Sequence, residues 1–318
     1  MNTLTHHAQP MIVESPPWPM IPAPSLAAGV EPFVRAAGHA SRLLPAQIHD
    51  ALVDFADRPH RSGAMLLRRV PIGQLPPTPS MPTTPSAKDC VSELTLLTIA
   101  RRLGQPVGYE PEHGGELVQN IVPTEAEIDR QVSTSSKVQL MFHTEAAFHP
   151  HRPHYLLLLC LRGDPAAATT LSSILEVMPQ LGSGVVDVLF QPRFRTAVDE
   201  SHLHGRDNVL GPPMAVLFGD RERPSMVFDA DLMVGVDPEA DDALRVLGEA
   251  TAGHHTSVVL QPGELLIVDN TVAVHGRTSF EPRFDGTDRW LQRTFVVGDL
   301  APSAADRCGR VITTHFGI

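Results

Sequence analysis

A histidine and a glutamate that could bind one metal ion lie two positions apart, at His143 and Glu145. They follow the strand-like run KVQLMF, and in an extended chain the side chains at positions i and i+2 point to the same side. The imidazole and the carboxylate can therefore reach the same ion. A His-x-Glu triplet also occurs at the polar end of ordinary strands, so the pair alone leaves both interpretations open.

His275 supplies a third ligand of the same kind. It lies near the end of ELLIVDNTVAVHGR, where a glycine-containing turn would let its ring project from a barrel mouth. In this run, Asp269 and Asn270 are expected to make turn hydrogen bonds that place the strand carrying His275. Two histidines and one carboxylate form the facial triad that leaves three positions on Fe(II) for a bidentate cosubstrate and O2. The same ligands also serve zinc, so a zinc hydrolase is an alternative.

Two arginines, Arg289 and Arg293, share strand parity in RWLQRTFVV, so both can face one cavity. A guanidinium can bind a carboxylate through two parallel hydrogen bonds. Metal chelation at one end and an arginine at the other would hold a five-carbon diacid such as 2-oxoglutarate. For either arginine taken alone, a surface ion pair is the alternative role.

Two blocks of sequence extend this pattern, HTEAAFHPHRPHYLLLLCLRGDPAAATT and VDNTVAVHGRTSFEPRFDGTDRWLQRTFVV. Together they resemble the clavaminate synthase-like family of Fe(II)/2-oxoglutarate oxygenases, over about residues 90–300. Within that family the chain is most similar to the branch that hydroxylates free L-amino acids. The resemblance implies a mainly β fold with flanking helices and a double-stranded β-helix, or jelly-roll, core. It also implies Fe(II), 2-oxoglutarate and O2.

The resemblance makes His143, Glu145 and His275 the iron ligands, and Arg289 the partner of the distal carboxylate of 2-oxoglutarate. Thr170, in the AATT run, matches a position that often hydrogen-bonds the cosubstrate in related oxygenases. Glu145 stands where the wider superfamily usually has Asp, and its longer side chain would also reach the substrate amine.

The substrate pocket has fewer signals. The resemblance places Arg293 at the substrate α-carboxylate, and Gln119 and Ser133 at its amino-acid backbone. Asp229 and Asp231 stand at positions i and i+2 in SMVFDADLMVG, where paired carboxylates would bind a guanidinium or an ammonium group. Two turn-forming aspartates in a solvated loop would explain the same spacing.

These features predict an enzyme that hydroxylates C3 or C4 of a free L-amino acid, arginine or another basic one first, in natural-product biosynthesis. One alternative substrate class is a neutral amide amino acid such as asparagine, glutamine or citrulline. An alternative of another kind is a jelly-roll protein that binds metal without turnover. No second metal site is expected at His149, His151 and His154, because two prolines interrupt that cluster.

The composition excludes several other classes. The formal net charge of −11 argues against nucleic acid and anionic membranes, which require a clustered positive surface. The three cysteines have neither zinc-site nor disulfide-framework spacing, which suggests a reducing, cytoplasmic location. No apolar run approaches the roughly 20 residues of a membrane helix. The sequence does not indicate an oligomeric state.

The chain is expected to comprise an N-terminal arm at 1–30 and one oxygenase domain at 31–318. The spacing predicts helices over 30–67, with Pro45 near a helix start, and a further helix from an N-cap at Ser92 to Gly104. The proline-rich segment 71–88 indicates a linker or an extended surface loop. Short β-rich runs then predict a jelly-roll core over about 115–300, interrupted by one helix beginning in DPEADD.

Overall fold

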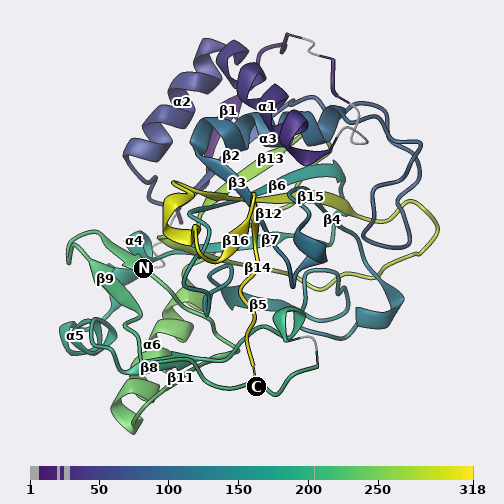
Figure 1. Ribbon diagram of the computed structural model, residues 1–318. Helices are drawn as coiled ribbons and strands as arrows, with labels where there is room; N and C mark the ends of the chain where they lie inside the picture. Colours follow the sequence, from purple (N-terminus) through teal and green to yellow (C-terminus); the bar gives the residue numbers. More distant parts are fainter. Residues whose placement is uncertain (1–6, 20–21, 25–28, 204, 318) are drawn as a thin grey trace.

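The computed structural model describes residues 7–19, 22–24, 29–203 and 205–317. It is mainly β with flanking helices, as the sequence predicts (Figure 1). Within the described residues, the large sheet has nine strands in the order β1-β2-β13-β6-β15-β3-β17-β16, with β4 pairing with β15 beside this path. Its strands are β1 (Met11–Glu14), β2 (Ala64–Arg68), β3 (Gln105–Tyr109), β4 (Gln119–Ile121), β6 (Tyr155–Arg162), β13 (Leu265–Asp269), β15 (Trp290–Val297), β16 (Arg307–Cys308) and β17 (Val311–Ile312).

A second, antiparallel sheet faces the first. In the described chain it has four strands in the order β12-β7-β14-β5. Its strands are β5 (Leu140–His143), β7 (Thr169–Ser173), β12 (Thr256–Val258) and β14 (Ala273–Arg277). Two further antiparallel pairs are β8 (Phe194–Thr196) with β11 (Met233–Gly235), and β9 (Leu217–Gly219) with β10 (Pro224–Met226).

The apolar run of β6 shows how the layers pack. Leu157 and Leu159 lie in a core shared with the N-terminal helices, whereas Leu156 and Leu158 lie in a core shared with the second sheet. A strand that is buried on both faces needs apolar residues at every position, which is why this segment does not alternate. Residues 156–159 are therefore core on both faces of β6.

Helices cover the outer sides of both sheets. α1 to α3 lie over the large sheet, and α4 to α6 lie at the opposite end of the molecule (Figure 1). The helix predicted from DPEADD is α6, whose N-cap Asp237 accepts a hydrogen bond from the backbone N–H of Ala240 at 3.0 Å. The helices are α1 (Val30–Ala40), α2 (Ala46–Asp57), α3 (Val91–Leu103), α4 (Ile174–Val177), α5 (Ser183–Leu189) and α6 (Pro238–Gly253). None of the helices in the described chain is both long and apolar enough to span a membrane.

The start of α3 differs from its prediction. Cys90, not Ser92, is the N-cap, and the Ser92 hydroxyl is buried and donates to Gln292 Oε1 at 2.7 Å. The predicted end at Gly104 is confirmed. A Cβ at Gly104 would lie 2.4 Å from the Val297 carbonyl oxygen, so the close approach of β15 requires glycine there.

Parts of the predicted N-terminal arm and the proline-rich segment 71–88 pack against the rest of the fold. In the predicted arm, β1 pairs in parallel with β2, although residues 1–6, 20–21 and 25–28 lie outside the described part. The segment 71–88 is an extended loop packed on the sheets: the Thr78 hydroxyl donates to the Asp288 carbonyl at 2.7 Å. The loop interpretation is therefore the correct one of the two.

Candidate metal centre and cosubstrate cavity

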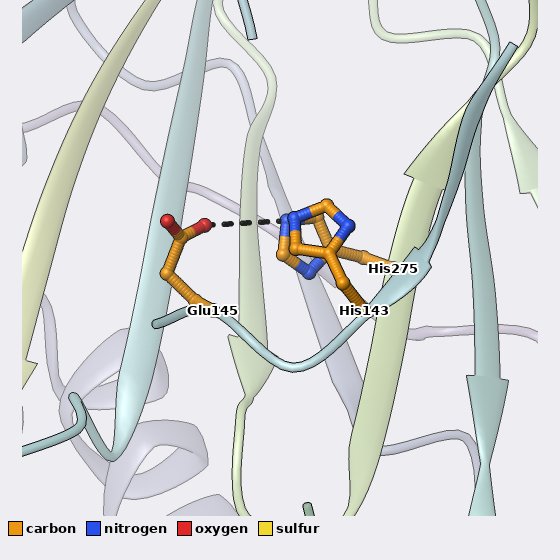
Figure 2. A group of neighbouring side chains, drawn as sticks. All are labelled: His143, Glu145 and His275. Carbon is orange, nitrogen blue, oxygen red and sulfur yellow. Dashed lines mark ion pairs between the residues drawn. The ribbon is translucent and has the colours of Figure 1, made fainter. Parts of the chain in front are cut away.

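The three predicted metal ligands meet at two neighbouring strands of the second sheet. β5 and β14 pair with His143 opposite His275, and Glu145 follows two residues later. One potential ligand atom from each residue lies within 4.8 Å of the other two. Figure 2 shows the Glu145 carboxylate facing both imidazole rings. Among the described residues, this is the one such group of three or more histidines, cysteines and carboxylates.

Asn270 holds the backbone of Glu145 in place. Its Oδ1 accepts from the Glu145 N–H at 2.8 Å, and its Nδ2 donates to the Glu145 carbonyl at 3.1 Å. The neighbouring Asp269 accepts from the Thr271 N–H at 3.0 Å and forms the turn that leads into β14. The sequence predicted turn hydrogen bonds here, and the structure adds that the same turn fixes the carboxylate ligand.

Unsatisfied atoms show that this group fits a cation. Within the described residues, Glu145 Oε2 and His275 Nδ1 are buried without a hydrogen-bond partner, and Glu145 Oε2 lies 3.4 Å from His275 Nε2. His143 Nδ1 lies 2.9 Å from the Met141 carbonyl, which can only accept. That nitrogen therefore carries the proton, and Nε2 keeps a lone pair for a metal. A bound divalent cation would offset the cost of the unpaired carboxylate oxygen.

The protonation states also suit metal binding. Burial, together with the adjacent His143, lowers the pKa of His275 to about 4, so its ring is neutral at pH 7. Burial alone would raise the pKa of Glu145, but the Arg293 guanidinium and His275 outweigh it and lower that pKa below its usual range. Neutral imidazole and ionised carboxylate are the forms that ligate a metal.

The triad opens into a cavity of about 340 Å³. Its lining contains most of the predicted site residues, from both sheets and from the loops between them. Those residues are Ser133, His143, Glu145, Asp229, Asp231, His275, Arg289 and Arg293. The two that do not line it are Gln119 and Thr170.

Arg289 is the cation in this cavity that lacks a protein partner. Its side chain is buried, and within the described residues it makes no hydrogen bond or ion pair; its guanidinium lies 6.0 Å from the centre of the Phe280 ring. Burial lowers its pKa to about 10, so it stays protonated at pH 7. A buried charge without a partner is costly, and a ligand carboxylate would supply the missing bidentate contact.

Arg293 lies four residues after Arg289 and lines the same cavity, but other residues hold its side chain. Its Nε donates to Gln119 Oε1 at 2.9 Å, its Nη2 forms an ion pair with Glu112, and its Nη1 lies 3.5 Å from Glu145 Oε1. Gln119 therefore reaches the cavity only through Arg293. Glu112 was missed from the sequence, because nothing in YEPEHGG marks it as the partner of an arginine far along the chain.

The remaining predicted residues are placed as follows. Ser133 lines the cavity. Thr170 pairs with Gly276 in β14, and it is its neighbour Thr169 that lines the cavity. Because neighbouring strand residues point to opposite faces, a one-residue difference decides which threonine meets a ligand.

The two aspartates differ in exposure. Asp229 is buried, and its Oδ1 accepts from the backbone N–H groups of Asp231 and Leu232, each at 2.9 Å. Asp231 is exposed, although it also lines the cavity. One oxygen of Asp229 therefore has the turn-forming role that was the alternative to substrate binding. Its second oxygen remains available to bind a substrate.

The three histidines at which no second metal site was expected, His149, His151 and His154, make different contacts in the structure. His149 Nδ1 accepts from the His151 N–H at 2.9 Å, His151 Nε2 faces Asp306 at 2.8 Å, and His154 Nδ1 accepts from the Gly298 N–H at 2.7 Å. These contacts do not converge on one point, although His149 Nε2 is buried without a hydrogen-bond partner among the described residues.

A mainly β fold with a two-histidine, one-carboxylate centre and an unpaired arginine in the same cavity defines a class of protein, the iron- and 2-oxoglutarate-dependent dioxygenases. Residues 87–295 match the model of the family described as taurine catabolism dioxygenase TauD, TfdA family. The chain belongs to this family.

Characterised relatives extend over most of the chain. It is 42% identical to L-asparagine oxygenase of Streptomyces coelicolor over 86% of this chain and 83% of the relative. It is 37% identical to L-lysine 3-hydroxylase of Catenulispora acidiphila, over 89% and 81%. It is 33% identical to clavaminate synthase 2 of Streptomyces clavuligerus, over 85% of each. The family resemblance in the two sequence blocks is thereby confirmed.

Solved structures agree with this placement. Asparagine oxygenase in complex with Fe(II), 2S,3S-3-hydroxyasparagine and succinate matches with a TM-score of 0.85 and 39% identity, covering 90% of each chain. The non-heme iron oxygenase OrfP with Fe and alpha-ketoglutaric acid matches with a TM-score of 0.80 and 33% identity, covering 90% of this chain and 94% of that one. The donor set of this chain fits the same iron and cosubstrate.

Proposed function

We propose that the protein hydroxylates C3 or C4 of a free L-amino acid, with Fe(II), 2-oxoglutarate and O2. The observation that carries the proposal is the combination in one cavity of a partly unsatisfied triad, His143, Glu145 and His275, with the partner-free Arg289. A metal site alone would fit a storage protein or a zinc hydrolase. A buried cation for a carboxylate has no evident use in metal storage, and the match to a dioxygenase family argues against the hydrolase.

Each residue has a distinct role in this proposal. The triad would hold Fe(II), which supplies O2 activation coupled to decarboxylation of 2-oxoglutarate. Arg289 would bind the distal carboxylate of the cosubstrate, and Thr169 or Thr170 would flank it from β7. Arg293, already oriented by Gln119 and Glu112, would bind the substrate α-carboxylate.

The remaining contacts would fix the substrate in one orientation. The second contact of Glu145 would be the substrate amine, with Ser133 beside the amino-acid backbone. These contacts set which carbon faces the metal, since orientation in a closed cavity decides which bond reacts.

A cationic amino acid, arginine first and then lysine or ornithine, is the substrate class that we favour. Asp229 is buried and Asp231 stands at the cavity edge, so a cation would offset a carboxylate that is otherwise costly to bury. The likeness to L-lysine 3-hydroxylase supports this choice.

A neutral amide amino acid is the second candidate, and one observation favours it. Asp229 already accepts two backbone N–H groups through Oδ1, and Asp231 is exposed, so the pair does not form a buried fork for a guanidinium. A single carboxylate oxygen would suit the NH2 group of asparagine or glutamine. The likeness to L-asparagine oxygenase supports this reading.

Three finer predictions complete the proposal. The two facing sheets form the double-stranded β-helix core expected of the family, within one oxygenase domain at 31–318. The product serves natural-product biosynthesis. The protein works in a reducing cytoplasm, which agrees with the absence of disulfides among Cys90, Cys160 and Cys308, all three in the described chain.

The experiment that tests the proposal is amino-acid-dependent succinate formation. Purified protein with Fe(II), 2-oxoglutarate and O2 is offered arginine, lysine, ornithine, asparagine, glutamine and citrulline, and products are analysed by mass. We expect one amino acid to gain the mass of one oxygen atom with matching succinate. Absence of succinate with the whole panel would favour a metal-binding protein, and turnover that depends on zinc without O2 uptake would favour a hydrolase.

A further inference from the structure

The carboxy-terminal segment, residues 313–317, packs against the wall of the cavity without lining it. It follows β17, which pairs in parallel with β3, and is drawn in yellow in Figure 1. None of its residues is among those that line the cavity. The segment itself therefore lies behind residues that line the cavity.

Phe316 makes the main contacts of this segment. Its ring centre lies 5.0 Å from that of Phe148 and 5.1 Å from that of His149, both edge-on. Its carbonyl oxygen accepts from Arg206 Nη1 at 3.4 Å. The next residue, Gly317, has φ +82, and a Cβ there would lie 2.8 Å from the Arg206 Cβ. The tail thus fits closely against the loop that contains Arg206.

Of the residues that Phe316 contacts, Phe148 also faces the cavity. Its ring centre lies 4.9 Å from that of His202. Asp199, Ser201 and His202 also line the cavity, from a segment whose regular structure is the short 3-10 helix Glu200–His202. Such a short helix depends on tertiary contacts for its order. Glu200 of this helix forms an ion pair at 2.6 Å with Arg130, which lines the cavity.

We propose that residues 313–317 are a positioning element of the substrate cavity, in which Phe316 holds Phe148 and the 199–203 wall in their binding arrangement. This inference rests on the proposed function. A wall that is ordered before the substrate arrives lowers the entropic cost of binding. Within the described chain, residues 313–317 make no hydrogen bond or ring contact with Arg289. Loss of their contacts should therefore weaken binding of the amino acid and leave binding of 2-oxoglutarate unchanged.

The activity test compares Phe316→Ala with wild type, using the amino acid that supports turnover. Loss of two edge-to-face contacts is expected to raise the KM for the amino acid about tenfold, which corresponds to about 1.4 kcal/mol. The KM for 2-oxoglutarate should stay within about twofold. Succinate should exceed hydroxylated product, because the amino acid is no longer held during cosubstrate turnover. Phe316→Tyr keeps the aromatic ring, so its KM for the amino acid and its ratio of succinate to hydroxylated product should match those of the wild type.

Two further variants serve as controls. Phe218→Ala removes a phenylalanine that is 41% exposed in β9, and should change none of these values. Gly317→Ala keeps the Phe316 ring and displaces the tail by steric contact with Arg206, so it should reproduce the effect of Phe316→Ala. A KM for the amino acid that is unchanged in both tail variants overturns the proposal, as does an equal rise for both substrates together with a fall in thermal stability.

Hydrogen–deuterium exchange without substrate provides a test that is independent of turnover. Peptides covering 199–207 should exchange several times faster in Phe316→Ala than in wild type, and peptides covering β14 should not change. If no amino acid supports turnover, the proposed function fails, and the exchange result alone decides whether the tail holds the wall. Unchanged exchange at 199–207 rejects the tail's role whatever the activity.

Discussion

Polar side chains are buried on both faces of β15. On one face they have hydrogen-bond partners within the protein, and on the other some of them do not. On the face toward α3, Gln292 donates to Glu93 Oε1 at 2.7 Å and accepts from Ser92, while Trp290 donates to Asn120 at 2.8 Å. On the cavity face, Arg289 has no hydrogen-bond or ion-pair partner in the described chain, and Glu145 Oε2 beside this face accepts no hydrogen bond.

This difference separates groups that stabilise the fold from groups that bind ligands. Buried polar groups normally have their partners within the protein, because an unmade hydrogen bond costs free energy. Where the protein leaves a buried cation and a carboxylate oxygen unpaired, a ligand can supply the missing contacts. Substitutions on the α3 face should therefore reduce stability, and substitutions on the cavity face should reduce ligand binding.

The largest effect is expected from the triad. His143→Ala or His275→Ala should lower Fe(II)-dependent succinate formation by more than about 100-fold, since loss of ligand-supporting contacts alone costs 10–100-fold. The fold should survive, as shown by unchanged thermal unfolding of the metal-free protein. His39→Ala, at an exposed position in α1, is the control. Full activity in either triad variant would reject the ligand assignment.

The next effect is on the α3 face. Lys88 is buried and forms an ion pair with Glu93 at 2.7 Å, so Lys88→Met leaves a buried carboxylate without its counter-charge. The free energy of unfolding, measured by urea denaturation, should fall by about 3–5 kcal/mol. The KM for 2-oxoglutarate should not change.

Adding Glu93→Gln to Lys88→Met should recover part of that stability, because the unpaired charge is then removed. A variant that loses cosubstrate affinity while keeping its stability would contradict the division between the two faces of β15.

Arg289 should behave in the reverse manner. Arg289→Ala should weaken 2-oxoglutarate binding by about 2–5 kcal/mol, the cost of removing one partner of a buried charge pair. The free energy of unfolding of the ligand-free protein should be unchanged or higher, since a buried cation without a partner is lost. The apparent KM for 2-oxoglutarate and urea denaturation measure the two effects. An unchanged KM would move the cosubstrate clamp to Arg293.

The sequence was sufficient for this central pattern because it depends on local spacing. The i and i+2 spacing predicted that His143 and Glu145 reach one ion, and strand parity predicted that Arg289 and Arg293 share one cavity; all four line it, although Glu145 lies in the turn after β5. The apolar run at 156–159 likewise indicated a β-strand, and the structure shows that this strand is buried on both faces.

Features that depend on contacts between distant segments were not predictable. Strand β1 forms because residues some fifty positions later offer it a parallel edge, which a proline-flanked MIVE segment does not reveal. Glu112 gains its role only from Arg293, and Ser92 is not a cap because Gln292 binds its hydroxyl. The choice between Thr169 and Thr170 depends on a register that no local pattern fixes.

The smallest effects on ligand binding are expected from substitutions of Asp229 and Asp231. These two residues test the proposed substrate end of the cavity. Asp229→Asn removes a buried charge, and the KM for a cationic amino acid should rise about 10- to 100-fold, as for a charge-assisted hydrogen bond of about 1.5–3 kcal/mol. Asp231→Asn removes an exposed charge worth at most about 1 kcal/mol, so the rise should not exceed about fivefold. Both variants should keep the wild-type KM for 2-oxoglutarate, because neither aspartate adjoins Arg289 among the contacts of the described chain.

The substrate preference of the wild type decides how this last result is understood. In one outcome, arginine or lysine is turned over fastest, with a larger rise in its KM in Asp229→Asn than in Asp231→Asn. In that case the buried carboxylate binds the substrate cation, just as Arg289 is expected to bind a carboxylate. If asparagine or glutamine is fastest, the acidic-pocket interpretation is wrong, and Asp229 accepts from an amide NH2 group instead. Normal arginine turnover in both Asn variants would show that the two aspartates only stabilise their loop. Oδ1 of Asp229 already has that role, because it accepts hydrogen bonds from the backbone of its own turn.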